Sequence, residues 1–299
     1  MENILITGAE GFIGSSLRRH LQKSNRMGSI IGIDLPDLDL ADLKAVRAFL
    51  ETCRPSRIVH LAASLARQED ESSRTQQWRN TFQTGRNLLE AAVAAKVAHL
   101  IMAGTIDELG SQNGVLTPDL PAQPRTTYGL CKSLLREVAE FYTRREALRI
   151  DWFRPFPVYG PGQMGTMLIP YAFQMAQEGR PAEFTDGRQI RDFLYIDDLL
   201  EWLRLALQVD LTRCLQGEFH LHHLGSQAGT SVARVLELIA AEFPGAIFHL
   251  GVRRRPAHEP DVQMAPKYSS PDFPLKGWTP SISCQEGIAK TARWWKTKN

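Results

Sequence analysis

Three glycines directly follow a short apolar run at the start of the chain. Residues 4–6 predict a buried strand, Gly8, Gly11 and Gly14 follow it, and the residues after Gly14 have the pattern of a helix. Glycines without Cβ let backbone N–H groups approach a diphosphate at a helix N-terminus. Asp34 ends the next apolar run, 20 residues past Gly14, where an acid can accept ribose hydroxyls. The spacing therefore predicts a dinucleotide-binding strand, turn and helix.

The composition is that of an ordinary globular protein. At roughly 100–200 residues per domain, 299 residues predict one large domain or two closely packed ones. Lys and Arg total 35 and Asp and Glu total 33, so a net charge of +2 gives no extended field for nucleic acid or a membrane surface. We find neither a leader-like N-terminal segment nor an apolar run of about 18 residues. We expect a soluble cytoplasmic protein without nucleic-acid or membrane partners.

Cysteines and histidines do not form a metal-binding pattern. The cysteines lack CxxC and Cys/His pairing, which favours reduced thiols over a disulfide framework or a structural zinc site. They are Cys53, Cys131, Cys214 and Cys284. His220, His222 and His223 share one extended segment without a recognisable carboxylate spacing, and His60 is expected beneath the cofactor as a strand residue. We therefore predict no metal site.

Strand and helix patterns alternate in the first half of the chain, which is typical of a parallel, doubly wound sheet. The expected strands are 4–6, 30–33, 57–61, 100–102 and 150–154, and the expected helices are 43–50, 88–97 and 128–145. Asp39 and Asp42 supply capping groups before the helix that begins at Leu43.

The pattern changes from about Pro155, where a proline- and glycine-rich loop begins. Helices are expected at 168–178, 197–207 and 231–243, and extended segments at 182–185 and 218–221. We predict an α/β protein: a Rossmann-type doubly wound parallel sheet with a smaller C-terminal substrate-binding α/β lid. The dinucleotide-binding domain would comprise 1–165, with 190–222 returning to it, and the lid would comprise 166–189 and 223–299.

Tyr128 and Lys132 stand four residues apart on one face of a predicted helix. A phenol has an ordinary pKa of about 10, and a nearby ammonium favours the phenolate. The pair therefore has the chemistry of an acid/base catalyst that works near neutral pH.

Further motifs stand in a familiar order along the chain. They are Thr7 to Gly14, Ile58 to Ala63, Asn80 to Ala91, Tyr128 with Lys132, Arg154 to Gly162, and Arg191 to Asp198. In this order the motifs resemble those of extended short-chain dehydrogenase/reductases. Over nearly its whole length the chain is similar to the NAD-dependent epimerase/dehydratase family, which implies NAD as cofactor and a nucleoside-diphosphate sugar as substrate.

The resemblance implies three catalytic residues. Tyr128 would donate or accept the proton. Lys132 would activate Tyr128 and bind the nicotinamide ribose, and the Thr105 hydroxyl would hydrogen-bond the reacting oxygen. Thr105 is placed by counting back from Gly110, because two serines and a tyrosine of the family's usual segment are missing here. A structural threonine that caps a loop is the alternative.

The resemblance also implies binding residues. Asp34 would hold the adenosine ribose, and Asp39 and Leu40 would lie near the adenine. The full set of cofactor residues is Gly8, Gly11, Phe12, Ile13, Gly14, Asp34, Asp39, Leu40, Leu61, Ala62, Ala63, Asn80, Tyr128, Lys132 and Pro155. Arg191 matches the arginine on the substrate diphosphate, and either Arg254 or Arg255 could be a second, because guanidinium pairs well with phosphate. A solvated arginine run is the alternative for the latter two.

The sequence narrows the reaction without fixing it. Sugar 4,6-dehydratases of the family carry Thr-Asp-Glu where this chain has Thr105-Ile106-Asp107, which disfavours dehydration unless a bulge brings Asp107 and Glu108 into register. We expect hydride transfer at C4 of the hexose, by a 4-epimerase or a 4-ketoreductase of deoxysugar or polysaccharide precursor synthesis. A non-catalytic NAD(H)-binding sensor or scaffold is the alternative.

Two segments, 81–97 and 128–146, carry more apolar residues than one buried stripe needs. These are Leu88, Leu89, Ala92, Ala95, Leu134, Leu135, Val138, Ala139 and Tyr142. In the family the matching helices commonly pair in a four-helix bundle, so the resemblance implies a C2 homodimer. The alternative is that these residues face only the monomer's own sheet.

Overall fold

A six-stranded parallel sheet forms the centre of the molecule. The computed structural model describes residues 3–23, 28–64, 66, 68–213, 217–267 and 278–298. The strand order is β11-β6-β4-β3-β1-β2, with every neighbouring pair parallel. The strands are β1 (Asn3–Thr7), β2 (Ser29–Ile33), β3 (Arg57–His60), β4 (His99–Ala103), β6 (Arg149–Pro155) and β11 (Glu218–Leu224).

The direction of winding reverses at β1, because β2 pairs with one edge of β1 and β3 pairs with the other. In open parallel sheets the ligand crevice forms at such a switch point, outside the carboxyl ends of the strands. The glycine loop after β1 therefore occupies the position where a dinucleotide binds. The predicted Rossmann-type fold is confirmed.

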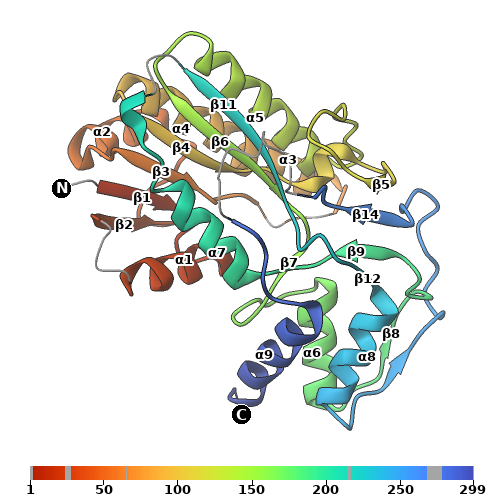
Figure 1. The fold of residues 1–299 in the computed structure, drawn as a ribbon. Helices are drawn as coiled ribbons and strands as arrows, with labels where there is room; N and C mark the ends of the chain where they lie inside the picture. Colours follow the sequence, from red (N-terminus) through yellow and green to blue (C-terminus); the bar gives the residue numbers. More distant parts are fainter. Residues whose placement is uncertain are drawn as a thin grey trace.

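Successive residues of each strand face two different cores. Ile4, Ile6, Val59 and Phe153 face one side, with α1 (Phe12–Gln22) and α7 (Ile196–Ala206). The residues between them, such as Leu5, Ile58 and Trp152, face the opposite core. There the covering helices are α2 (Leu43–Cys53), α4 (Thr84–Ala94) and α5 (Thr127–Thr143). Figure 1 shows α1 and α7 together on one side, with α2, α4 and α5 on the other.

Smaller elements lie beyond the carboxyl end of the sheet. A four-stranded sheet has the order β12-β9-β14-β5, and two pairs, β7 with β10 and β8 with β13, complete the strands. Their bounds are β5 (Gly114–Val115), β7 (Val158–Tyr159), β8 (Ala182–Glu183), β9 (Ile190–Asp192), β10 (Leu194–Tyr195), β12 (Gly229–Ser231), β13 (Phe248–His249) and β14 (Val262–Met264). Helices α6 (Leu168–Glu178), α8 (Val232–Glu242) and α9 (Cys284–Lys296) pack against one another below them (Figure 1).

The remaining helical pieces are short. They are α3 (Glu71–Gln77), the π-helix η1 (Trp78–Gln83), and the 3-10 turns η2 (Ile106–Leu109) and η3 (Leu211–Arg213). Within the described ranges, no helix is both long and apolar enough to cross a membrane. Cys53, Cys131 and Cys284 are free thiols, and Cys214 lies outside the described residues. The division into two domains stays a prediction.

Candidate active site

The glycine loop after β1 has no room for larger residues. Gly8 has φ +70°, and a Cβ there would lie 2.7 Å from the backbone nitrogen of Ala62. A Cβ at Gly14 would collide with the carbonyl oxygen of Gly8. Gly11 caps the start of α1, where backbone N–H groups are available to an anion. The loop therefore fits a dinucleotide diphosphate, and Phe12 and Ile13 lie half-buried beside it in the first turn of α1.

The predicted ribose acid lies beside this loop. Asp34 directly follows β2, and its Oδ2 accepts a hydrogen bond from the Glu10 nitrogen at 3.0 Å. Leu61 follows β3, and its nitrogen donates to the Thr7 carbonyl oxygen at 3.1 Å. Ala62 and Ala63 continue this half-buried segment. The carboxyl ends of β1, β2 and β3 thus bring together groups that are far apart in the sequence.

Asp39, Leu40 and Asn80 lie in neighbouring segments. Asp39 accepts a hydrogen bond from Arg79 at 2.7 Å, and the bond from the Ala41 nitrogen, followed by Arg79, holds its pKa below the ordinary value. The Leu40 carbonyl oxygen accepts a bond from the buried amide of Asn87 at 3.1 Å. Asn80 lies within η1, and π-helical turns occur frequently at functional sites.

Lys132 connects α5 to the end of β4. Its side chain is 1 % exposed, and Nζ donates to the Ala103 carbonyl oxygen at 2.6 Å. The same Nζ lies 6.0 Å from the centre of the Tyr128 ring. Gly129 packs its backbone against the Asp107 carbonyl oxygen, where a Cβ would lie 2.5 Å away. These contacts hold Tyr128 and Lys132 against the segment that contains Thr105.

Thr105 is the N-cap of η2. Its Oγ1 accepts a hydrogen bond from the Asp107 nitrogen at 3.2 Å, and its own nitrogen donates to Glu108 Oε1 at 3.0 Å. The capping alternative for Thr105 is therefore present in the structure. A hydroxyl that accepts one bond still has a proton to donate, so the cap leaves the predicted contact with a reacting oxygen available.

His60 lies beneath this region, at the end of β3. Its Nδ1 is 2.7 Å from Thr7 Oγ1. Burial, and then the nearby charge of Lys132, lower its pKa to about 3, so the ring is neutral. Among the other histidines, His222 bonds to Asp151 and His223 bonds to the Leu116 carbonyl oxygen, so both stabilise the core.

Two of the three predicted substrate arginines meet at one carboxylate. Arg191 of β9 is 12 % exposed and contacts Glu259 Oε1 at 2.9 Å, and Arg255 Nε lies 3.4 Å from Glu259 Oε2. Burial lowers the pKa of Arg191, and Glu259 opposes that shift. Arg254 is exposed, and the ion pairs to Glu259 involve Arg191 and Arg255. The sequence analysis did not identify Glu259 as a partner of these arginines, although a carboxylate four residues after Arg255 could have indicated an ion pair.

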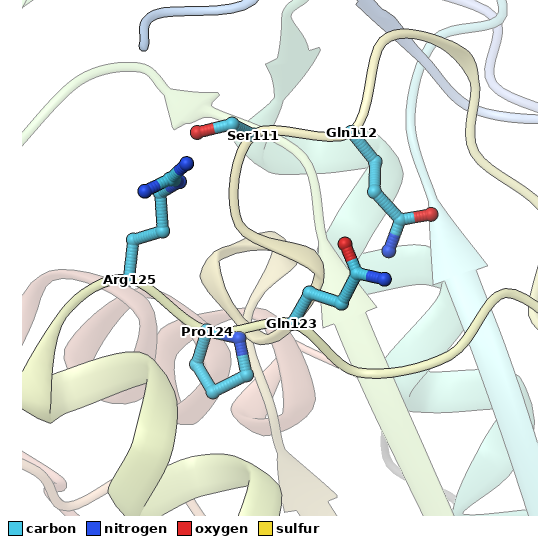
Figure 2. Close-up of a pocket in the computed structure, with 5 residues that line it drawn as sticks. All are labelled: Ser111, Gln112, Gln123, Pro124 and Arg125. Atoms are coloured by element: carbon cyan, nitrogen blue, oxygen red, sulfur yellow. The ribbon is translucent and has the colours of Figure 1, made fainter.

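A hollow of about 450 Å³ opens between the segment after η2 and the segment before α5. Figure 2 shows the amides of Gln112 and Gln123 turned toward one another and the Arg125 side chain extended toward Ser111. Gln112 Nε2 donates to the Pro121 carbonyl oxygen at 2.7 Å. None of the predicted site residues lines this hollow, although Arg125 stands only three residues before Tyr128 in the sequence.

The fold and the glycine loop define a dinucleotide-binding protein of the α/β class. Comparison with protein families narrows this class, because the family model "NAD dependent epimerase/dehydratase family" matches residues 4–213. The chain belongs to this family, and NAD is its cofactor. The roles assigned to individual side chains stay predictions.

Similar proteins match over almost the whole chain. A probable UDP-glucuronate 4-epimerase of Rhizobium meliloti is 27% identical, covering 97% of this chain and 96% of its own length. A dTDP-glucose 4,6-dehydratase of Neisseria meningitidis is 24% identical, covering 99% of this chain and 93% of its own. The solved structure of MoeE5 in complex with UDP-glucuronic acid and NAD has a TM-score of 0.86 and 26% identity, covering 99% of this chain and 100% of the other.

Proposed function

We propose that this chain is an NAD-dependent nucleotide-sugar 4-epimerase that acts on a UDP-hexose or UDP-hexuronate. The observation that carries the proposal is the gathering of Tyr128, Lys132 and Thr105 at the carboxyl end of β4. Lys132 Nζ lies 6.0 Å from the Tyr128 ring and 2.6 Å from the carbonyl oxygen two residues before Thr105. Similarity to UDP-glucuronate and UDP-glucose 4-epimerases supports the reaction class.

Each residue has a defined task in this proposal. Bound NAD supplies a reversible hydride acceptor for C4 of the sugar. Tyr128 takes the proton from the C4 hydroxyl and returns it after the 4-keto sugar has rotated in the site. The Lys132 ammonium favours the phenolate form of Tyr128. Thr105 donates a hydrogen bond to the same oxygen, which stabilises the charge that develops there.

The substrate diphosphate is assigned to Arg191 and Arg255. Both guanidiniums reach Glu259, so they already share one anionic partner, and bidentate pairing suits them to phosphate. Arg254 is exposed outside this group, which favours Arg255 as the second arginine. Uridine nucleotides are proposed because MoeE5 was solved with UDP-glucuronic acid and with UDP-glucose.

Dehydration is disfavoured by the residue at position 106 and by the surroundings of Glu108. Ile106, which stands where dehydratases carry an acid, is an apolar residue that is 9% exposed, and this disfavours an acid at that position. The Glu108 carboxylate is fully buried against Trp152 and Arg154. A 4-ketoreductase would use the same residues, and it differs from the epimerase in consuming reduced cofactor.

The test is incubation of the purified protein with UDP-glucose, with UDP-glucuronic acid and, in the presence of NADH, with a UDP-4-keto-6-deoxyhexose, followed by proton NMR of the sugar. We expect the C4 epimer to form without net change in NADH absorbance. A 4-keto-6-deoxy product would show a dehydratase, and turnover only of a keto sugar with NADH loss would show a ketoreductase. No reaction with any of these would favour the NAD-binding sensor.

A homodimer is proposed through α5 and the neighbouring η1. Five of the apolar residues named for this contact are buried in the monomer's own core, namely Leu88, Leu89, Ala92, Leu135 and Ala139. Leu134 remains exposed and is joined by Leu130, Phe141 and Trp78, each 38–48% exposed. The surface left for a partner is therefore narrower than the sequence suggested, and three of its four residues, Leu130, Leu134 and Phe141, lie on the predicted helix 128–146.

A further inference from the structure

Glu108 is a buried carboxylate for which the proposed reaction has no direct use. It lies in η2, three residues after Thr105, and its side chain is fully buried. A buried charge is costly unless partners compensate it, so its contacts indicate what it does.

Four donor groups surround the two carboxylate oxygens. Oε1 accepts bonds from the Thr105 nitrogen at 3.0 Å and from Trp152 Nε1 at 3.1 Å. Oε2 accepts bonds from Arg154 Nε at 2.9 Å and Nη2 at 2.8 Å. Both oxygens are thus held by strong, charge-assisted or buried bonds, and the carboxylate is unsuited to act as the acid of a dehydration.

The same carboxylate joins the elements that meet at the candidate site. Thr105 follows β4, Trp152 and Arg154 belong to β6, and Arg136 of α5 brings its Nε to 3.7 Å from Oε2. Helix α5 also carries Tyr128. Glu108 therefore links the backbone of the predicted hydroxyl donor to the helix of the predicted acid/base.

Arg154 is itself fixed at its other end. Its Nη1 lies 3.2 Å from His223 Nε2, and His223 Nδ1 lies 2.7 Å from the Leu116 carbonyl oxygen. Burial lowers the pKa of His223 to about 4, so the neutral ring can accept from the guanidinium and donate to the carbonyl. The network that anchors Glu108 therefore extends over several elements.

We infer that Glu108 is a positioning residue, which fixes the Thr105 backbone so that the Thr105 hydroxyl is presented to the reacting sugar oxygen. The inference rests on the proposed function for its catalytic consequence and on the contacts above for the anchoring itself. Thr105 has no other described side-chain anchor on its backbone nitrogen than this carboxylate.

A double-mutant cycle tests the catalytic consequence. Glu108→Gln keeps the shape but replaces one acceptor oxygen by a donor, so the four donors can no longer all be satisfied. We expect kcat to fall by about tenfold or more, with KM and NAD affinity within about twofold. In a Thr105→Val background, which lacks the hydroxyl, the same change should alter kcat by less than about twofold. Equal losses in both backgrounds, or no loss in either, would overturn the inference.

Hydrogen–deuterium exchange tests the anchoring without any substrate. Trp152→Phe removes one bond to Glu108 and leaves the carboxylate paired with Arg154, so this variant is expected to fold. We expect faster exchange in residues 103–110 of Trp152→Phe and also of Glu108→Gln, because the Trp152 indole packs directly against Gly104 and only the Glu108 variant leaves that contact in place. The matched control is Trp202→Phe, because Trp202 is equally buried and its indole nitrogen has no partner among the described residues. Unchanged exchange in Trp152→Phe or in Glu108→Gln, or the same increase in Trp202→Phe, would contradict the anchor. If the wild-type protein turns over no nucleotide sugar, the proposed function fails while this comparison still decides the role of Glu108.

Discussion

At the residue scale, the candidate chemistry depends on one phenol with a buried ammonium beside it. Tyr128→Phe should lower turnover of the nucleotide sugar by about 10²- to 10⁴-fold, because the proton carrier is lost. NAD affinity should change little, since the ring and the helix remain. Lys132→Met should weaken both turnover and NAD binding, because it also removes the bond to the Ala103 carbonyl oxygen. Steady-state rates and NAD titration measure the two effects.

The matched control for this prediction is Tyr142→Phe. Tyr142 is a half-buried tyrosine on the same helix, α5, and lies about four turns from Tyr128. We expect full activity for this variant. Wild-type turnover in Tyr128→Phe would show that another group moves the proton.

Asp34 is predicted to set the preference for NAD over NADP. Its carboxylate can accept the ribose hydroxyls of NAD and repels a 2′-phosphate. The guanidinium of Arg18, which lies by Gly32 on β2, is already paired with Glu10 and so does not cancel this repulsion. NADH should bind more tightly than NADPH by about 1–3 kcal/mol.

Parallel titrations of NADH and NADPH measure this preference. Asp34→Ala should narrow the difference between the two cofactors, whereas Asp37→Ala, a nearby exposed acid, should leave it unchanged. Tighter NADPH binding by the wild-type protein would refute the assignment of Asp34.

At the scale of elements, a buried polar cluster lies toward the amino-terminal ends of the central strands. Asp151 of β6 accepts bonds from His99 Nε2 and His222 Nε2, both at 2.7 Å, and from Arg149 Nε at 2.8 Å. Arg57 Nη1 lies 3.1 Å from His99 Nδ1, and because arginine can only donate, His99 is neutral with its proton on Nε2. The cluster therefore joins β3, β4, β6 and β11 through neutral histidines.

This cluster predicts a loss of stability in mild acid. Burial lowers the pKa of His99 and His222 from the ordinary value of 6.5. As the pH falls below about 6.5, each of these histidines therefore binds a proton in the unfolded chain and not in the folded protein. Each one then lowers the free energy of unfolding by up to about 1.4 kcal/mol per pH unit. The pKa of Asp151 is held well below 3.8 by His222 and His99 against the opposing effect of burial, so its contribution is lost only in stronger acid.

Denaturant unfolding between pH 7.5 and 5 measures this dependence. His222→Gln should flatten the fall in unfolding free energy, since one titrating group is removed. His258→Gln, at an exposed histidine, should leave the slope as it is in the wild type. An unchanged slope in His222→Gln would show that the acid sensitivity arises elsewhere.

The elements differ in how far the sequence could predict them. Helices α6 and α8 were predicted almost to the residue, because their stop and start signals are local: Gly179 ends α6, and the Ser231 hydroxyl caps α8. Strands β5 and β14 were missed, because segments of two and three residues exist only through pairing across about 150 positions. The bond from Arg154 to Glu108 spans 46 positions, so no local pattern could reveal that network.

At the scale of the whole molecule, the exposed apolar residues on α5 predict self-association. Leu130, Leu134 and Phe141 stand at positions i, i+4 and i+11, which fall on one face of a helix. Their exposed fractions are 38%, 38% and 48%, and Trp78 of η1 is 39% exposed. Helix α5 packs against η1, so the four side chains belong to adjacent elements. A two-fold axis would let the same face on a second copy cover them, which is how an isologous dimer buries such a surface.

Light scattering after size-exclusion chromatography tests this prediction at micromolar concentration. We expect a dimer for the wild-type protein and a monomer for Leu134→Glu combined with Phe141→Glu, because two like charges from each copy would meet in the buried contact. NAD affinity should stay near the wild-type value in that variant, since neither residue belongs to the cofactor set. The matched control is Val252→Glu, which places a charge on an apolar residue that is 56% exposed outside α5 and should remain dimeric. A wild-type monomer would exclude the dimer, and a dimer that survives both glutamates would place the contact on another face.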